Sequence, residues 1–126
     1  LKAEEARMLE LVNRERTAAG LQPLILHPHL SEVARLKSAD MVAQNYFSHQ
    51  SPTYGSPFDM MRSFGISYRL AGENIALAPS VDRAHNALMN SSGHRKNILN
   101  PDYAYIGIGM AEGPRGQYFT QMFIRQ

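Results

Sequence analysis

The chain has no cysteine, no long apolar run and no cluster of basic residues. Without cysteine, neither a disulfide nor a thiolate metal site can form. This absence fits a cytosolic protein and equally an exported bacterial protein that folds without disulfides, so it leaves the compartment open. No apolar run approaches the roughly 20 residues of a membrane helix, and we expect no transmembrane segment in this chain.

The chain also has no large excess of positive or negative charge. The net charge is +2 at pH 7, and the 13 lysines and arginines are spread along the chain. A nucleic-acid partner is therefore not expected, because it would need basic residues gathered on one face. With 126 residues and 44% hydrophobic content, the chain can bury one core, and we expect a single domain over residues 1–126. Since it begins with Leu1 and not Met, we expect a domain trimmed from a longer protein.

Hydrophobic periodicity and turn residues predict both helices and strands. The expected helices cover 4–19, 28–45, 57–64 and 80–90, and the expected strands cover 68–78, 104–111 and 117–125. Adjacent strands at the end of the chain indicate an antiparallel sheet covered by helices, which is an α+β fold. Within the strand pattern, Gly107 and Gly109 fit close backbone packing better than a phosphate-binding loop.

Three polar segments contain the residues that could carry chemistry, namely His49, Glu73 and His94. Two imidazoles and a carboxylate can hold a divalent metal, and they can also perform acid–base chemistry near neutral pH. The three lie far apart in the sequence and match no local metal motif, so only the fold can bring them together. Each also has a structural alternative: His49 as a surface residue, Glu73 as a backbone acceptor, and His94 as the solvated end of a helix.

A family resemblance covers nearly the whole chain. The segments that carry it, in order, are Leu11–Arg16, Gly20-Leu21, Pro23-Leu24, Ala39–Met41, Asn45–His49, Gly72–Ala76, Ser91–Leu99, Ile106–Gly109 and Tyr118–Gln121. This ordered set resembles bacterial domains of the CAP superfamily, also called SCP/TAPS or PR-1-like. The resemblance implies an α-β-α sandwich with a central antiparallel sheet, and a secreted or cell-envelope location.

Family members with the full site have two histidines and two glutamates around a cleft that can bind zinc. By resemblance, His49 matches the first histidine and Glu73 the first glutamate. Ser91 stands where the second glutamate is usual, and Tyr118 stands where the second histidine is usual. His94 belongs to a bacterial variant of the motif and is expected to restore an imidazole to the cleft.

The expected cleft residues are His49, Glu73, Ser91, His94, Tyr118 and Gln121. We expect no required cofactor, and only weak binding of a divalent cation such as zinc at His49, Glu73 and His94, because hydroxyl groups are poor zinc ligands. The leading hypothesis is a non-enzymatic exported domain that binds a lipid, an envelope polymer or a protein in this cleft. The alternatives are a divalent-metal-dependent hydrolase or protease, and a structural module of envelope or spore-coat assembly.

Overall fold

The computed structural model describes residues 1–126 as five helices and one four-stranded sheet. The helices are α1 (Ala3–Ala18), α2 (Pro28–Ala43), α3 (Pro57–Ser63), α4 (Val81–Met89) and α5 (Ser92–Ile98). The strands are β1 (Ile25–Leu26), β2 (Leu70–Ala78), β3 (Tyr105–Gly113) and β4 (Gly116–Arg125). No helix is both long enough and apolar enough to cross a membrane.

The strands are ordered β1-β3-β4-β2 across the sheet. β3, β4 and β2 pair in antiparallel fashion, which confirms the predicted sheet for these three strands. β1 adds two residues parallel to β3, so the complete sheet is mixed. This strand was not predicted, because two residues beside Pro23 are too few to show a strand pattern. β2 is the opposite edge strand and has no strand on its outer side.

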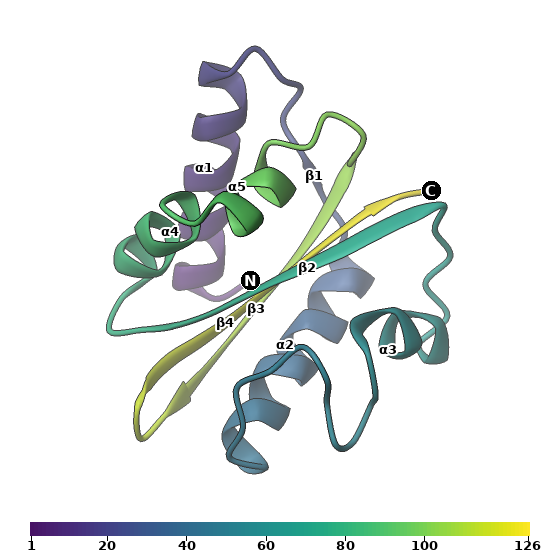
Figure 1. Ribbon diagram of the computed structural model, residues 1–126, viewed down its shortest axis with the longest axis vertical. Helices are drawn as coiled ribbons and strands as arrows, with labels where there is room; N and C mark the ends of the chain where they lie inside the picture. Colours follow the sequence, from purple (N-terminus) through teal and green to yellow (C-terminus); the bar gives the residue numbers. More distant parts are fainter.

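Helices cover both faces of the sheet, as the predicted α-β-α sandwich requires. In Figure 1, α1, α4 and α5 lie on one side of the sheet, and α2 and α3 lie on the other. The first layer buries a cluster of 13 apolar residues that includes Met8, Leu88, Ile108 and Phe119. The second buries a cluster of eight. Burial of these two clusters is the main force that holds the layers together.

The close packing expected at Gly107 and Gly109 is confirmed. A Cβ atom added to Gly107 would lie 2.4 Å from the backbone carbon of Leu30, and one added to Gly109 would lie 2.1 Å from the backbone nitrogen of Arg35. The backbone of α2 therefore rests directly on the backbone of β3, at a separation that only glycine allows.

One predicted boundary differs near the site. The sequence pattern placed His94 after a helix that ends before Gly93, but His94 lies inside the separate helix α5. Ser91 has an extended backbone, which stops α4 and starts α5. Because Gly93 is at the second helical position of α5 and has no positive φ angle, it does not act as a helix stop.

Candidate functional site

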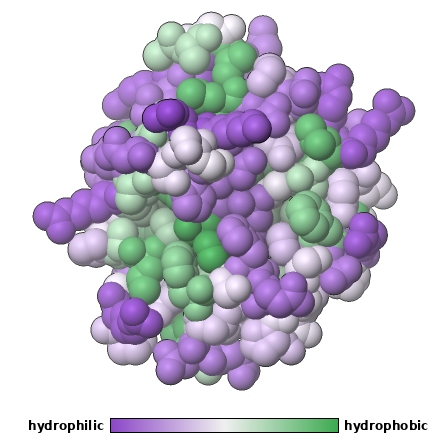
Figure 2. Space-filling model, in the orientation of Figure 1, coloured by the Kyte–Doolittle hydropathy of each residue, from purple (hydrophilic) through white to green (hydrophobic).

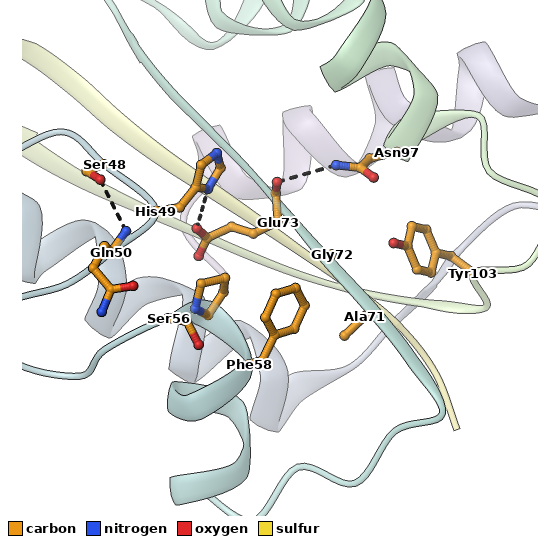
Figure 3. A pocket seen from close by; sticks show the side chains of 11 residues that line it. Ser48, His49, Gln50, Ser56, Phe58, Ala71, Gly72, Glu73, Asn97 and Tyr103 are labelled. Carbon is orange, nitrogen blue, oxygen red and sulfur yellow. Dashed lines mark hydrogen bonds and ion pairs between the residues drawn. The ribbon is translucent and has the colours of Figure 1, made fainter.

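The largest cavity, of about 590 Å³, opens over the outer edge of β2. Figure 3 shows that β2 crosses its floor, between the loop after α2 with α3 on one side and α5 with Tyr103 on the other. Its lining residues are Ser48, His49, Gln50, Ser56, Pro57, Phe58, Ala71, Gly72, Glu73, Asn97 and Tyr103. Two of the residues expected in the cleft, His49 and Glu73, therefore line the same cavity.

His49 and Glu73 form a hydrogen-bonded pair. His49 Nδ1 lies 2.8 Å from Glu73 Oε1, as drawn in Figure 3. The carboxylate is buried, with its side chain 1% exposed, whereas the imidazole is 52% exposed. Because Nδ1 is taken up by the carboxylate, Nε2 is the ring nitrogen left for another partner. The pair thus presents a fixed, accessible ring nitrogen at the cavity, backed by a buried acceptor.

The loop that carries His49 is held from below by Lys37 of α2. The Lys37 side chain is buried, and its Nζ donates to the backbone oxygens of Ser48 at 2.8 Å and His49 at 2.9 Å. Burial lowers the pKa of Lys37, while the nearby charges of Glu73 and Asp40 partly oppose this shift. The ammonium group therefore fixes the backbone at the residue that contacts Glu73.

Asp40, one turn further along α2, holds the rest of the same loop. Its carboxylate accepts hydrogen bonds from the hydroxyl groups of Tyr46, Ser51 and Thr53. Burial alone would raise the pKa of Asp40, but the three hydrogen bonds outweigh it and hold the pKa below its usual value. The pKa of Tyr46 is raised, by burial and by its bond to Asp40. The His49 loop is thus anchored at both ends to one helix.

Replacing Lys37 with methionine is expected to loosen this loop. The substitution keeps the apolar stem but leaves two backbone oxygens without their charged donor, at a cost of about 2 kcal/mol in unfolding free energy. Amide hydrogen exchange should become faster across residues 46–55 and stay unchanged in β3. The matched control is Lys96→Met, because Lys96 is exposed. If the two variants showed the same exchange in the loop, Lys37 would not be its anchor.

The opposite cavity wall is tied to the sheet by amide side chains. Asn97 Nδ2 donates to Asn74 Oδ1 at 2.9 Å and, more weakly, to the backbone oxygen of Glu73 at 3.4 Å. Asn74 Nδ2 in turn donates to the backbone oxygen of His94 and to Gln121 Oε1, both at 3.1 Å. Through these bonds α5 is held against β2 and β4, which fixes the width of the cavity.

His94 lies on α5 outside the lining of the cavity. Its Nδ1 lies 2.9 Å from the hydroxyl oxygen of Ser91, the residue that precedes α5, and it has no bond to Glu73. Burial lowers the pKa of His94, and the charge of His49 lowers it further. The two imidazoles are therefore close enough to influence each other, although only His49 is bonded to the carboxylate.

The side chains do not form a metal-ligand set. No group of three or more histidine, cysteine, aspartate or glutamate side chains is arranged to hold a metal ion. His94 is turned to Ser91, and the second carboxylate oxygen of Glu73 is buried without a partner. Zinc requires three or four converging ligands. As arranged, His49 and Glu73 supply two, so these residues do not fit a zinc ion.

Tyr118 and Gln121 of β4 lie on opposite faces of the sheet, and neither lines the cavity. Tyr118 is buried beside Met41 and Ile75, and its ring contacts that of Phe47 edge-on, with centroids 6.3 Å apart. Gln121 is fully buried and accepts the bond from Asn74 described above. Both residues therefore pack behind the cavity and do not contact a ligand bound in it.

The residues that shape the cavity or its loop and that sequence reasoning did not single out include Lys37, Phe58, Asn97 and Tyr103. Asn97 could have been found, because it lies inside Ser91–Leu99, one of the segments that carry the family resemblance. A tyrosine or phenylalanine in a loop or short helix carries no comparable signal, because such residues are usually core. Lys37 gave no signal either, since a lysine in an amphipathic helix is normally exposed.

The lowered pKa of His94 predicts a loss of stability in mild acid. The folded chain binds this proton less tightly than the unfolded chain, whose pKa is near 6.5. The unfolding free energy should therefore fall as the pH drops from about 7 through 6.5 to the folded-state pKa, and then level off. The carboxylates with lowered pKa, namely Glu5, Asp40, Asp59 and Asp82, affect stability only at lower pH.

Urea unfolding at pH 5 and pH 7 tests this prediction. The loss of stability between the two pH values should be smaller in a His94→Gln variant than in the parent. An equal loss in both proteins would show that another group carries the acid sensitivity.

Comparisons with known proteins agree with this architecture. Residues 9–123 match the CAP family, described as the cysteine-rich secretory protein family. The Bacillus subtilis (strain 168) protein YkwD is 55% identical over 125 residues, which cover 98% of this chain and 48% of YkwD. The B. subtilis membrane protein YlbC is 40% identical over 124 residues, which cover 97% of this chain and 34% of YlbC.

Among solved structures, an extracellular protein with an SCP domain from Bacillus anthracis str. Ames has a TM-score of 0.91 and 35% identity, over 98% of this chain and 40% of that one. An outer surface protein of Borrelia burgdorferi has the same TM-score at 20% identity, over 99% of this chain and 94% of that one, and so shares the fold. The chain spans half or less of the two Bacillus subtilis relatives. The family match over nearly the full length, together with these relatives, shows that the chain belongs to the CAP, or cysteine-rich secretory protein, family, although it contains no cysteine itself.

Proposed function

We propose that this chain is a non-enzymatic binding module that acts outside the cell or in the cell envelope and binds its partner in the cavity at His49 and Glu73. The observation that carries the proposal is the His49–Glu73 pair, in which a buried carboxylate holds an exposed imidazole at the mouth of a 590 Å³ cavity. A cavity of this volume lies within the range of ligand sites, and its mostly polar lining favours a ligand with polar groups.

The cavity offers recognition groups in place of a catalytic set. His49 bonds to Glu73, but no serine or threonine hydroxyl is bonded to the imidazole as a nucleophile would be. His94 does have a hydroxyl partner, Ser91, but no carboxylate is bonded to this imidazole to orient it. A metal-dependent hydrolase would require a third metal ligand that the arrangement does not supply.

The extracellular location is supported by relatedness. A relative that is 35% identical to this chain is described as an extracellular protein with an SCP domain. Because the chain spans less than half of that relative, the remaining part of such a protein could supply other activities, including assembly into an envelope structure. The binding proposal concerns this domain alone.

The experiment is an equilibrium binding comparison between the parent and a His49→Ala/Glu73→Gln double variant. The probes are phosphatidylglycerol vesicles, soluble peptidoglycan fragments and a library of short peptides. We expect at least one probe to bind the parent and to bind the double variant at least about tenfold more weakly, the effect of losing roughly one charge-assisted hydrogen bond. If no probe bound, or if every probe bound both proteins equally, the proposal would be wrong.

Zinc provides a second test of the same site. Calorimetric titration should give a dissociation constant of micromolar or weaker, because two ligands are too few for a tight site. Submicromolar zinc binding that disappears in the double variant, together with peptide or ester hydrolysis, would favour the hydrolase alternative.

A further inference from the structure

The two edges of the sheet are finished differently. Along the outer edge of β3, the backbone of β1 pairs with the first residues of the strand. Beyond the end of β1, side chains form hydrogen bonds with the backbone of β3 instead. The N–H of Ile108 donates to Ser31, the N–H of Met110 donates to Glu5, and the oxygen of Met110 accepts from Lys2. The edge of β3 is therefore closed by the chain itself, as expected for a sheet that avoids pairing with other chains.

The outer edge of β2 is not closed in this way. The register of β2, β4 and β3 places the outward backbone groups of β2 on alternate residues, Ala71, Glu73, Ile75 and Leu77. Among all these groups, only the oxygen of Glu73 has a partner, the 3.4 Å bond from Asn97. Of these four residues only Ala71 and Glu73 line the cavity, so they form the part of the edge that a ligand in the cavity can reach.

This accessible part coincides with the cavity. Ala71, Gly72 and Glu73 are consecutive lining residues, and Figure 3 shows β2 running across the cavity between its two walls. Glu73 as a whole is 6% exposed but its side chain only 1%, so the solvent reaches mainly its backbone. The unpaired backbone N–H groups of Ala71 and Glu73 and the unpaired backbone oxygen of Ala71 therefore lie at the cavity that holds the His49–Glu73 pair.

We propose that the cavity binds an extended peptide segment, which adds to the outer edge of β2 as a short strand and pairs with the backbone of Ala71 and Glu73. This inference rests on the proposed function and names the chemical class of its ligand. Strand addition satisfies unpaired backbone groups of an edge strand and depends on side-chain pockets for specificity. A membrane surface or a glycan strand lacks the alternating N–H and C=O groups that this edge would pair with.

The walls define which peptide fits. Side chains of an extended segment point alternately to the two faces of the sheet. On one face the peptide meets Pro57 and Phe58 of α3, where Phe58 is 39% exposed. On the other face it meets Asn97 and Tyr103. The preferred sequence therefore alternates an apolar side chain toward α3 with a polar side chain toward α5.

Figure 2 is consistent with a local site of this kind. On the face it shows, apolar patches are separated by hydrophilic side chains, with no continuous apolar surface. Specificity would therefore come from individual side chains of the peptide and from its backbone, rather than from burial of a large apolar face.

The test uses a phage-displayed library of random seven-residue peptides, followed by the synthetic peptide of the most enriched sequence with blocked ends. Binding is measured by fluorescence anisotropy to the parent, to Ala71→Pro and to Ala71→Ser. Proline removes the outward N–H at position 71 and is tolerated where an edge strand faces outward, whereas serine keeps that N–H at similar size. We expect Ala71→Pro to weaken binding by about tenfold and Ala71→Ser, which keeps the N–H, to weaken it much less.

Peptides that carry a single N-methyl group give a second readout that does not depend on folding of the proline variant. Methylation should abolish binding at alternate peptide positions and be tolerated between them, because only alternate residues face β2. Equal effects at adjacent positions would overturn strand addition.

The remaining outcomes separate this inference from the proposed function. If a selected peptide lost affinity in the His49→Ala/Glu73→Gln variant but not in Ala71→Pro, strand addition would be wrong while the cavity remained a binding site. If vesicles or peptidoglycan fragments bound through His49 and Glu73 and no peptide was enriched, the same conclusion would follow. If no probe bound, both would fail.

Discussion

Replacing Gly109 with alanine is expected to lower the unfolding free energy by about 3 kcal/mol or more. The new Cβ atom would lie 2.1 Å from the backbone nitrogen of Arg35 and 2.3 Å from the backbone carbon of Ala34. These are backbone atoms in the middle of α2, so no side chain can turn away, and the helix must move as a unit. Overpacking by one methyl group already costs about 1–3 kcal/mol where side chains can adjust.

The movement would also reach the site. α2 carries Lys37 and Asp40, which hold the His49 loop, and Ser38, whose hydroxyl donates to the backbone oxygen of Gly109 at 3.0 Å. We therefore expect the variant to lose affinity for any ligand of the cavity as well as stability.

The matched control is Gly93→Ala. Gly93 lies in α5 with no atom within 4 Å of an added Cβ, so alanine should be neutral or stabilise the protein by about 0.5–1 kcal/mol through helix propensity. Chemical denaturation of both variants gives the comparison. If Gly109→Ala were as stable as Gly93→Ala, the direct contact of α2 with β3 would be disproved.

Replacing Arg16 with methionine is expected to cost about 3–5 kcal/mol of unfolding free energy. The Arg16 side chain is buried, and its guanidinium donates to the backbone oxygens of Gln22, Ile98, Asn100 and Tyr103. Burial lowers its pKa, yet the group stays charged because an arginine pKa starts so high. Removing the donor leaves several carbonyl groups without partners in the interior, and each costs about 1–3 kcal/mol.

Three of these oxygens, those of Ile98, Asn100 and Tyr103, belong to the segment that forms one wall of the cavity. Ile98 ends α5 one residue after Asn97, and Tyr103 is itself a lining residue. Loss of Arg16 should therefore release the wall as well as lower stability, and amide exchange should become faster in residues 97–104. Arg14→Met is the control on the same helix, because Arg14 is exposed and should change stability little. Equal stability of the two variants would contradict the role given to Arg16.

Most of the fold could be predicted from the sequence because its signals are local. The periodicity of residues 4–19 identified α1, and Pro28 at the start of a helix identified α2. The hairpin turn at residues 112–116 identified β4 as the strand that follows it. β1 could not be predicted, since its two residues are a strand only through pairing with β3. α5 was not predicted because a glycine such as Gly93 often ends a helix. In the structure the break between the two helices lies earlier, at Ser91.

The site was predictable only in part, for a physical reason. The residue types of His49 and Glu73 made them candidates, but each also had a structural alternative, and it was the family resemblance that matched them to a cleft histidine and glutamate. The structure places them 2.8 Å apart. His94 lies on α5, where its ring is bonded to Ser91 and not to Glu73. The sequence pattern did not show this helix, so it could not place the ring. Lys37 is buried by the loop that folds over it, which helical periodicity cannot indicate.

The most direct test of binding at the His49–Glu73 cavity is an amide-resolved NMR titration of the ¹⁵N-labelled chain with the strongest probe from the binding panel. We expect the largest shift changes at Ser48–Gln50, Ala71–Glu73 and Asn97, which surround the His49–Glu73 pair. Small and scattered changes at these amides, with the largest ones around Glu32 and Leu36 on the outer face of α2, would contradict a binding site in this cavity.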